Sequence, residues 1–226
     1  EPGSTVAVIG CGGVGLAAVQ YAQAVGAEVF ATASAGKHTF LRSLGVRHIS
    51  TSRDAEQFQR EMAPMVGERG LDVVLNSLTT GKYIEHAVGM LATTGSRFVE
   101  IAKRNIWTAE EMTERRPDVG YFTHSLNEQL PEHPELLAPM LTALAARVDS
   151  GAAKPLPMKV FEMRGQLESA FRWLREGRSI GKVVVRVEPP PQTSQLGVVL
   201  ITGGLGGLGL VTAEVFAELG ASCVVL

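Results

Sequence analysis

Three glycines constrain this chain more than any other feature of its sequence. Gly10, Gly12 and Gly15 have the spacing G-x-G-x-x-G and directly follow the apolar run 6–9. In a strand–turn–helix unit, the first glycine permits a tight turn, the second lets the backbone approach a pyrophosphate, and the third lets the helix pack on the strand. The residues after Gly15 have helical apolar spacing, and residues 28–33 resemble a second strand. The pattern predicts a dinucleotide site; the alternative is a tight strand-to-helix turn in another kind of α/β protein.

The loop after the second predicted strand bears on which dinucleotide binds. An NAD site usually places an acidic residue there to accept hydrogen bonds from the ribose hydroxyls. Here the loop contains Ser34 and Lys37 and no acid. Both side chains can donate to a 2′-phosphate, which favours NADP(H). The alternative for Lys37 is a solvated residue in the first turn of a helix over residues 37–44.

Strands and helices continue to alternate up to residue 101. We expect a third strand near residues 46–49, a helix over 54–66, a buried strand in 70–77, a helix over 82–91 and a strand over 97–101. This alternation predicts an α/β fold with a doubly wound parallel sheet, the Rossmann arrangement. Ligands lie beyond the carboxyl ends of such strands, so Asn76 and Ser77 should face the crevice, with Lys103 at the same edge.

The second half of the chain is less uniform. Residues 104–134 are interrupted by prolines and predict irregular structure around a strand-like segment at 119–123. Helices are expected over 135–150 and 166–176, with strands at 159–163 and 182–187. Residues 188–196, rich in proline and polar residues, predict a linker. Beyond them a second strand–turn–helix unit begins, in which Gly203, Gly206 and Gly209 lie in the turn TGGLGGLG.

Composition excludes several classes of function. With 45% hydrophobic and 19% charged residues among 226, the chain can bury a full core. A net charge of −2 gives no reason to expect nucleic acid or an anionic membrane as a partner. We also expect no membrane span and no signal peptide. The only cysteines, Cys11 and Cys223, support neither a disulfide framework nor a metal site, and a cytoplasmic location is the simplest expectation.

A family resemblance follows from these motifs. Residues 1–187 resemble the enoyl reductase domain of a modular type I polyketide synthase or animal-type fatty acid synthase, a zinc-independent medium-chain dehydrogenase/reductase. Residues 197–226 resemble the start of the ketoreductase domain of such synthases, with its TGGxGGLG hallmark. The stretches that carry the first resemblance are GGVGLAAVQYAQAVGAEVFATASAGK, LDVVLNSL, GSRFVEIAKRNIW, AAKPLPMKVF and AFRWLREGRSIGKVVVRV.

The resemblance implies a domain plan. Residues 1–152 would form the NADP(H)-binding Rossmann domain, residues 153–187 the return segment of a GroES-like substrate domain, and residues 188–196 the linker. Residues 197–226 would open a truncated ketoreductase Rossmann domain. The chain would then be a fragment of a homodimeric synthase, working beside neighbouring synthase domains and an acyl carrier protein.

The resemblance also implies a reaction. NADPH would deliver hydride to the β-carbon of an α,β-unsaturated acyl thioester on the carrier protein, and a proton would add at the α-carbon. Lys103 corresponds to a lysine proposed in this family as proton donor or oxyanion stabiliser. Ser125 stands where related sequences have a second catalytic candidate, an aspartate, and His124 is a possible substitute. Because strands alternate faces, at most one of these two should point at the site.

The remaining site assignments follow the same resemblance. The pyrophosphate would face backbone of the glycine turn, the 2′-phosphate would face Ser34 and Lys37, and the second glycine turn would hold a pyrophosphate in the same way. Residues expected along the cofactor are Gly10, Gly12, Gly13, Val14, Gly15, Asn76, Ser77 and Ile101 in the first unit and Gly203, Gly206 and Gly209 in the second. No metal ligand is expected.

Two other functions remain open from the sequence. One is a free-standing quinone oxidoreductase or zinc-independent alcohol dehydrogenase, against which the linker and the second glycine turn argue. The other is a nucleotide-binding domain of a synthase without turnover, which Ser125 at the aspartate position keeps open.

Overall fold

The strand–helix alternation predicted up to residue 101 is present in the computed structural model, which describes residues 1–188 and 197–226. Residues 189–196, most of the predicted linker, lie outside the described residues. The strands of the main sheet are β1 (Thr5–Ile9), β2 (Glu28–Ala33), β3 (His48–Thr51), β4 (Val73–Asn76), β5 (Arg97–Glu100) and β6 (Gly120–Thr123). The accompanying helices are α1 (Gly13–Ala24), η1 (Ala35–Lys37), α2 (His38–Ser43), α3 (Ala55–Val66), α4 (Tyr83–Gly89), α5 (Ala109–Arg115), α6 (Leu126–Glu132), η2 (Pro134–Leu136) and α7 (Leu137–Asp149), of which η1 and η2 are 3₁₀ helices.

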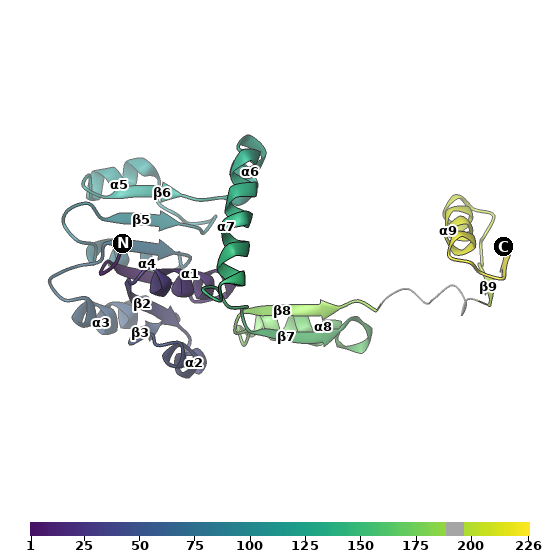
Figure 1. Ribbon diagram of the computed structural model, residues 1–226, viewed down its shortest axis with the longest axis horizontal. Coiled ribbons are helices and arrows are strands. Elements are labelled where there is room, and N and C mark those ends of the chain that lie inside the picture. The colour runs from purple at the N-terminus through teal and green to yellow at the C-terminus, as the bar shows by residue number, and fades with distance from the viewer. Residues whose placement is uncertain (189–196) are drawn as a thin grey trace. The chain divides into compact units, whose positions relative to one another are not determined.

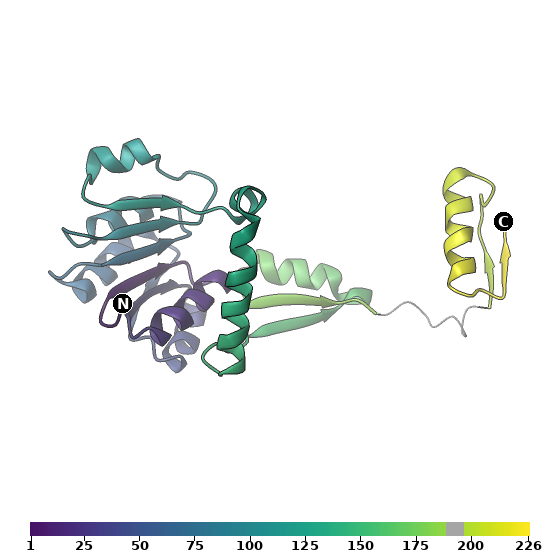
Figure 2. The same ribbon diagram turned by 45° about the horizontal axis from the view of Figure 1, so that its top comes forward.

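The main sheet has the order β3-β2-β1-β4-β5-β6, and its neighbouring strands all pair in parallel. Figures 1 and 2 show the six strands side by side. This is the doubly wound Rossmann order, so the predicted fold class is confirmed. All six carboxyl ends lie at one edge of the sheet, which is where ligands bind in such folds.

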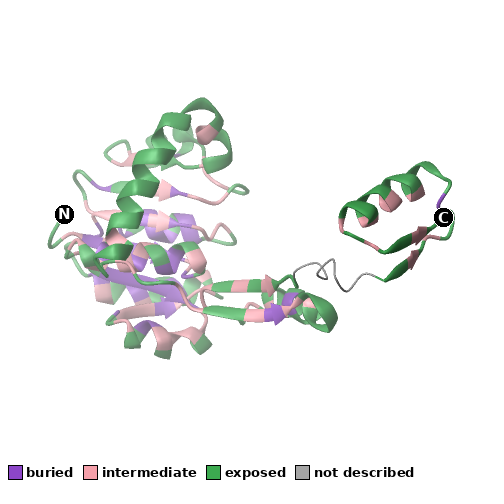
Figure 3. Ribbon diagram, turned by 45° about the vertical axis from the view of Figure 1, so that its right-hand side comes forward, coloured by how far each residue is buried: buried purple, intermediate pink, exposed green. Residues whose placement is uncertain are grey.

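Helices cover both faces of this sheet. Alternate residues of β1 point to opposite faces, so Ile9 belongs to the core cluster that includes side chains of α3, α4 and α5, whereas Val8 belongs to the cluster that includes α1 and α2. Figure 3 shows that the buried residues concentrate in these strands and in the helix surfaces facing them. The core therefore holds the carboxyl ends of the strands rigidly under the loops that follow them.

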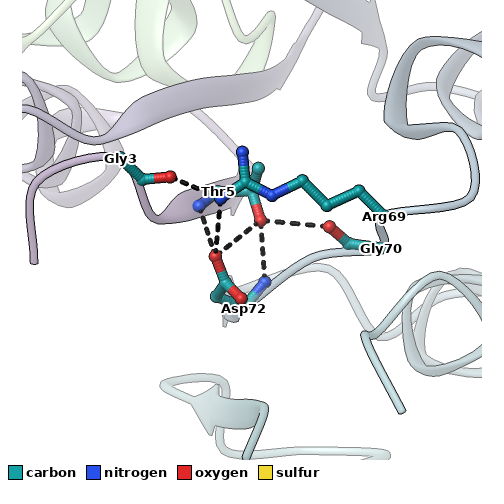
Figure 4. Close-up of polar contacts among 5 residues, drawn as sticks. All are labelled: Gly3, Thr5, Arg69, Gly70 and Asp72. Atoms are coloured by element: carbon teal, nitrogen blue, oxygen red, sulfur yellow. Dashed lines mark hydrogen bonds and ion pairs between the residues drawn. The ribbon is translucent and has the colours of Figure 1, made fainter. Parts of the chain in front are cut away.

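The opposite edge of the sheet is fixed by polar contacts at the start of β1 and β4 (Figure 4). The Asp72 carboxylate accepts a hydrogen bond from the Thr5 amide at 2.7 Å, and the Asp72 amide donates to Thr5 Oγ1 at 2.9 Å. Arg69 lies 3.6 Å from the same carboxylate. These contacts hold two central strands in register without involving the ligand-binding edge.

Two predictions about elements were wrong. The third strand begins at His48 rather than Val46, because Gly45, with φ 85°, ends α2 and the Val46 amide still bonds to the Leu41 carbonyl. The segment 104–134 is not irregular, since it contains α5 and α6. Helix α5 starts with a capping box, in which Thr108 Oγ1 accepts from the Glu111 amide at 3.1 Å and Glu111 accepts from the Thr108 amide at 2.8 Å.

The described chain divides into two compact units, Glu1–Lys159 with Arg172–Val183, and Val160–Phe171 with Val184–Leu226. The later elements are β7 (Met158–Glu162), α8 (Met163–Arg175), β8 (Lys182–Arg186), β9 (Val198–Leu200), α9 (Gly207–Glu218) and β10 (Cys223–Val225). Strands β7 and β8 form a two-stranded sheet, and β9 pairs in parallel with β10. No helix in residues 1–188 or 197–226 has the length and apolar character needed to cross a membrane.

Candidate active site

The turn after β1 requires glycine at two positions. Gly10 has φ 96°, and a Cβ there would collide with Ser77 Oγ. A Cβ on Gly15, in the first turn of α1, would lie 2.5 Å from the Gly10 carbonyl oxygen. These contacts hold the turn tightly against the helix, as the sequence predicts.

Gly12 is glycine for a different reason. It precedes α1 without a side chain to cap the helix, and a Cβ built on it would meet no atom within 4 Å. The amides of the first helical turn, which includes Gly13 and Val14, have no partner within the helix, and the helix dipole makes this end positive. Open space in front of unpaired amides fits a pyrophosphate.

Lys182 adds a cation to this turn. Its Nζ lies 3.4 Å from the position that a Cβ on Gly13 would occupy, while its amide donates to the Pro157 carbonyl at 2.8 Å. Sequence patterns do not reveal this residue, because a single lysine at the start of a distant strand has no recognisable motif.

The loops after β2 and β3 bring together a second set of cations. Ser34 precedes η1, which ends at Lys37. Burial first, and then the nearby Arg53 guanidinium, lower the pKa of Lys37. Arg53 lies two residues after β3, and its Nη2 is 2.8 Å from the position that a Cβ on Gly177 would occupy. Arg53 was also missed by the sequence analysis, although its place at the exit of the neighbouring parallel strand is a signal that could have identified it.

The predicted cofactor contacts after β4 are largely engaged within the protein. Asn76 is fully buried, and its amide nitrogen donates to Glu100 at 2.6 Å and to the Leu78 carbonyl at 3.1 Å. Ser77 Oγ donates to the Ile9 carbonyl at 2.8 Å. Ile101 is half-buried beside them, and its amide donates to the Asn76 carbonyl at 3.0 Å. Their contact with a cofactor remains a prediction.

The three candidate catalytic residues meet at one cavity of about 480 Å³ beyond the ends of β5 and β6. Lys103 follows β5, and both His124 and Ser125 follow β6. Both His124 and Ser125 line this cavity, and because β6 ends at Thr123, the alternation of a strand does not extend to them. Which of them acts at the site remains a prediction. The residues lining this cavity are Ala102, Lys103, Ile106, Thr123, His124, Ser125, Glu128, Gln129 and Glu132.

Ser125 Oγ is buried without a hydrogen-bond partner among the described residues. Ser125 is the N-cap residue of α6, but its side chain makes no capping hydrogen bond. Its buried hydroxyl therefore keeps its capacity to donate and to accept a hydrogen bond.

The second glycine turn has a similar construction. Gly203 has φ 73°, Gly206 precedes α9, and a Cβ on Gly209 would lie 2.5 Å from the Gly204 Cα. The turn joins β9 to α9 as the sequence predicts, and whether it binds a nucleotide remains a prediction.

Other reactive groups do not form a site. Cys11 is buried within the glycine turn, and burial raises its pKa to about 12, so it has the properties of a packing residue. Within the described parts of the chain, no group of three or more His, Cys, Asp or Glu side chains is arranged to hold a metal ion.

Comparison with known proteins agrees with this architecture. The profile of the zinc-binding dehydrogenase family matches residues 44–185. The chain is 40% identical over 205 residues to the spectinabilin polyketide synthase system protein NorB of Streptomyces orinoci, covering 90% of this chain and 9% of that protein. It is 37% identical over 230 residues to the pikromycin polyketide synthase component PikAII of Streptomyces venezuelae, covering 100% of this chain and 6% of that protein. The chain thus spans less than a tenth of the length of these relatives.

A solved structure gives the same result at the level of the fold. The crystal structure of the CurK enoyl reductase superimposes with a TM-score of 0.75 and 43% sequence identity, covering 83% of this chain and 56% of that one. The chain therefore belongs to the zinc-binding dehydrogenase family, and within that family it is similar to the enoyl reductases of modular polyketide synthases.

Proposed function

We propose that the protein containing this chain is an NADPH-dependent enoyl reductase that acts on α,β-unsaturated thioesters carried by an acyl carrier protein. One observation carries the proposal. A glycine turn with open space before the first turn of a helix and a cavity lined by Lys103, His124 and Ser125 lie at the same edge of one parallel sheet. The relatives at this level of identity are polyketide synthases, and the similar solved structure is an enoyl reductase.

A nicotinamide dinucleotide fits the residues of the first unit. The amides after Gly12, with Lys182 beside them, would hold the pyrophosphate. The phosphorylated form of the cofactor is supported by Lys37 and Arg53, which lie close enough for the guanidinium to lower the pKa of the lysine. An anion between two neighbouring cations relieves their mutual repulsion, so a 2′-phosphate is the group that this loop pair favours.

The residues around the cavity would handle the proton and the developing charge. When bound, NADPH would supply a hydride to the β-carbon of the substrate. Negative charge then grows on the thioester oxygen, and the Lys103 ammonium would stabilise it or give a proton to the α-carbon. Ser125 Oγ lacks a partner among the described residues and would donate a hydrogen bond, and His124, which lines the same cavity, would be the alternative proton donor.

The same resemblance supports proposals about the larger protein. We propose that residues 197–226 begin a ketoreductase domain, that neighbouring synthase domains and an acyl carrier protein are its partners, and that the parent is a homodimer. Its proposed location is the cytoplasm, since both cysteines are free thiols.

The test is turnover by the full-length protein. Purified enzyme supplied with a crotonyl thioester and NADPH should oxidise the cofactor, as followed by loss of NADPH absorbance. Binding of NADPH without oxidation would establish the nucleotide-binding domain without turnover instead.

Lys103→Met should lower kcat about 100-fold while NADPH affinity changes less than about twofold, since removal of a general acid has effects of this order.

A matched variant tests the assignment of Lys103. Lys154→Met removes an exposed lysine of the first unit that does not line the cavity, and it should leave kcat unchanged. Equal loss of kcat and of NADPH affinity in Lys103→Met would show that Lys103 binds cofactor and does not act on the substrate.

A further inference from the structure

Glu100 is a fully buried carboxylate at the last position of β5. Its Oε2 accepts a hydrogen bond from the Asn76 amide nitrogen at 2.6 Å, and its Oε1 accepts from the Ala102 amide at 2.8 Å. Burial raises the pKa of Glu100, and the bond from Asn76, followed by those from the backbone amides of Ala102 and Ile101, opposes that rise. Both oxygens thus face donors, which is the geometry of an ionised carboxylate.

Asn76, the last residue of β4, is oriented by the same contacts. Its amide nitrogen donates to the Leu78 carbonyl as well as to Glu100, and its Oδ1 accepts from the Leu78 amide at 3.2 Å. Both amide hydrogens and the oxygen are therefore in use, and the side chain cannot flip without reversing every bond. Glu100 and Asn76 together connect the exits of two neighbouring strands.

These contacts act on the loop of residues 101–107, which we call the Lys103 loop. At its start, the Ala102 amide is bound by Glu100 and the Ile101 amide by the Asn76 carbonyl at 3.0 Å. At its end, Tyr121 Oη donates to the Trp107 carbonyl at 2.7 Å. The loop is held at both ends, so the position of Lys103 over the cavity depends on these part-buried contacts.

We propose that Glu100 and Asn76 form a positioning pair that holds the Lys103 loop in the arrangement needed for turnover. The inference deepens the proposed function, on which the kinetic part of its test rests. A small displacement of a group that acts on the substrate can lower the rate strongly, whereas the glycine turn and the cations that bind the cofactor phosphates lie on other loops. Changes at Glu100, which is not among the predicted cofactor contacts, should therefore lower kcat and leave cofactor affinity unchanged.

The pair can be tested by relocating its charge in the full-length protein. In Glu100→Gln, either orientation of the new amide sets an N–H group against another donor, Asn76 or the Ala102 amide. In Asn76→Asp, two carboxylates face each other. The double variant E100Q/N76D restores an amide-to-carboxylate bond with its polarity reversed, although it loses the bond to the Leu78 carbonyl.

Three measurements separate the outcomes. Hydrogen–deuterium exchange of the peptide spanning residues 101–107 should speed up in each single variant and slow again in the double variant. With the crotonyl thioester, kcat should fall about 10- to 100-fold in Glu100→Gln, with the Kd for NADPH within about twofold of wild type. If the two changes were independent, the relative kcat of the double variant would equal the product of the relative kcat values of the single variants. The kcat of the double variant should be higher than this product by about fivefold or more, and the excess measures the coupling between the two residues.

The matched control is Glu114→Gln, the same substitution at an exposed position of α5, which should change none of these quantities. Equal losses of kcat and NADPH affinity in Glu100→Gln would overturn the proposal. So would a double variant in which residues 101–107 exchange as fast as in the worse single variant. If the wild-type protein binds NADPH but does not turn over, the proposed function fails, and the exchange rates alone decide whether the pair holds the loop.

Discussion

At the scale of single residues, we predict that Arg53 distinguishes the two forms of the cofactor. Its guanidinium lies near Lys37, and together they provide two cations where an NAD site has an acid. Arg53→Ala should weaken NADPH binding about tenfold, since a hydrogen bond to a charged group contributes roughly 1.5–3 kcal/mol. NADH binding should stay within about twofold, because NADH has no 2′-phosphate. Titration of the purified protein with each cofactor measures both constants.

The control for this prediction is Arg60→Ala, which removes an exposed arginine of α3 and should alter neither constant. A parallel loss of NADPH and NADH affinity in Arg53→Ala would mean that the guanidinium supports the fold of the loop and does not contact the 2′-phosphate.

At the scale of elements, the strand–turn–helix unit separates stability from binding at two of its glycines. A Cβ on Gly15 would lie 2.5 Å from the Gly10 carbonyl oxygen, whereas one on Gly12 would meet nothing within 4 Å. Gly15→Ala should therefore destabilise the fold by about 1–3 kcal/mol, the usual cost of overpacking. Gly12→Ala should leave the free energy of unfolding unchanged and weaken NADPH binding at least about tenfold, because its methyl group occupies the space of the pyrophosphate.

Urea unfolding and cofactor titration of the two variants measure these effects, and each variant is the control for the other. Normal NADPH affinity in a folded Gly12→Ala protein would place the pyrophosphate elsewhere.

The elements also show which features can be predicted from the sequence. The parallel α/β sheet could be predicted from the alternation of strands and helices, because parallel strands need such connections. The start of β3 was misplaced because Val46 has strand-like character but its amide still completes the turn after α2. Helix α5 was not predicted although its capping box is local, because the prolines that follow it favour irregular structure. Glu100 could not have been found, because a buried charge is recognised only once its partner Asn76 is known to lie on the adjacent strand.

At the scale of the whole molecule, the proposed nucleotide site draws on segments far apart in the chain. The glycine turn and the loop with Ser34 and Lys37 come from the first residues, and motif spacing identifies them. Lys182 and Gly177 come from a segment that returns to the same compact unit much later. Their approach to the turn depends on tertiary packing, which explains why motif spacing predicts the glycine turn but not the lysine beside it.

Lys182 gives a prediction that is distinct from that for Arg53. Its ammonium lies beside Gly13, at the pyrophosphate end of the site, and the pyrophosphate is common to both cofactors. Lys182→Met should therefore weaken NADPH and NADH binding alike, by about tenfold, which corresponds to about 1.4 kcal/mol. The difference from wild type should shrink at high salt, because screening weakens a charge–charge contact that remains partly exposed. Lys154→Met is the control, and selective loss of NADPH affinity in Lys182→Met would instead place this lysine at the 2′-phosphate.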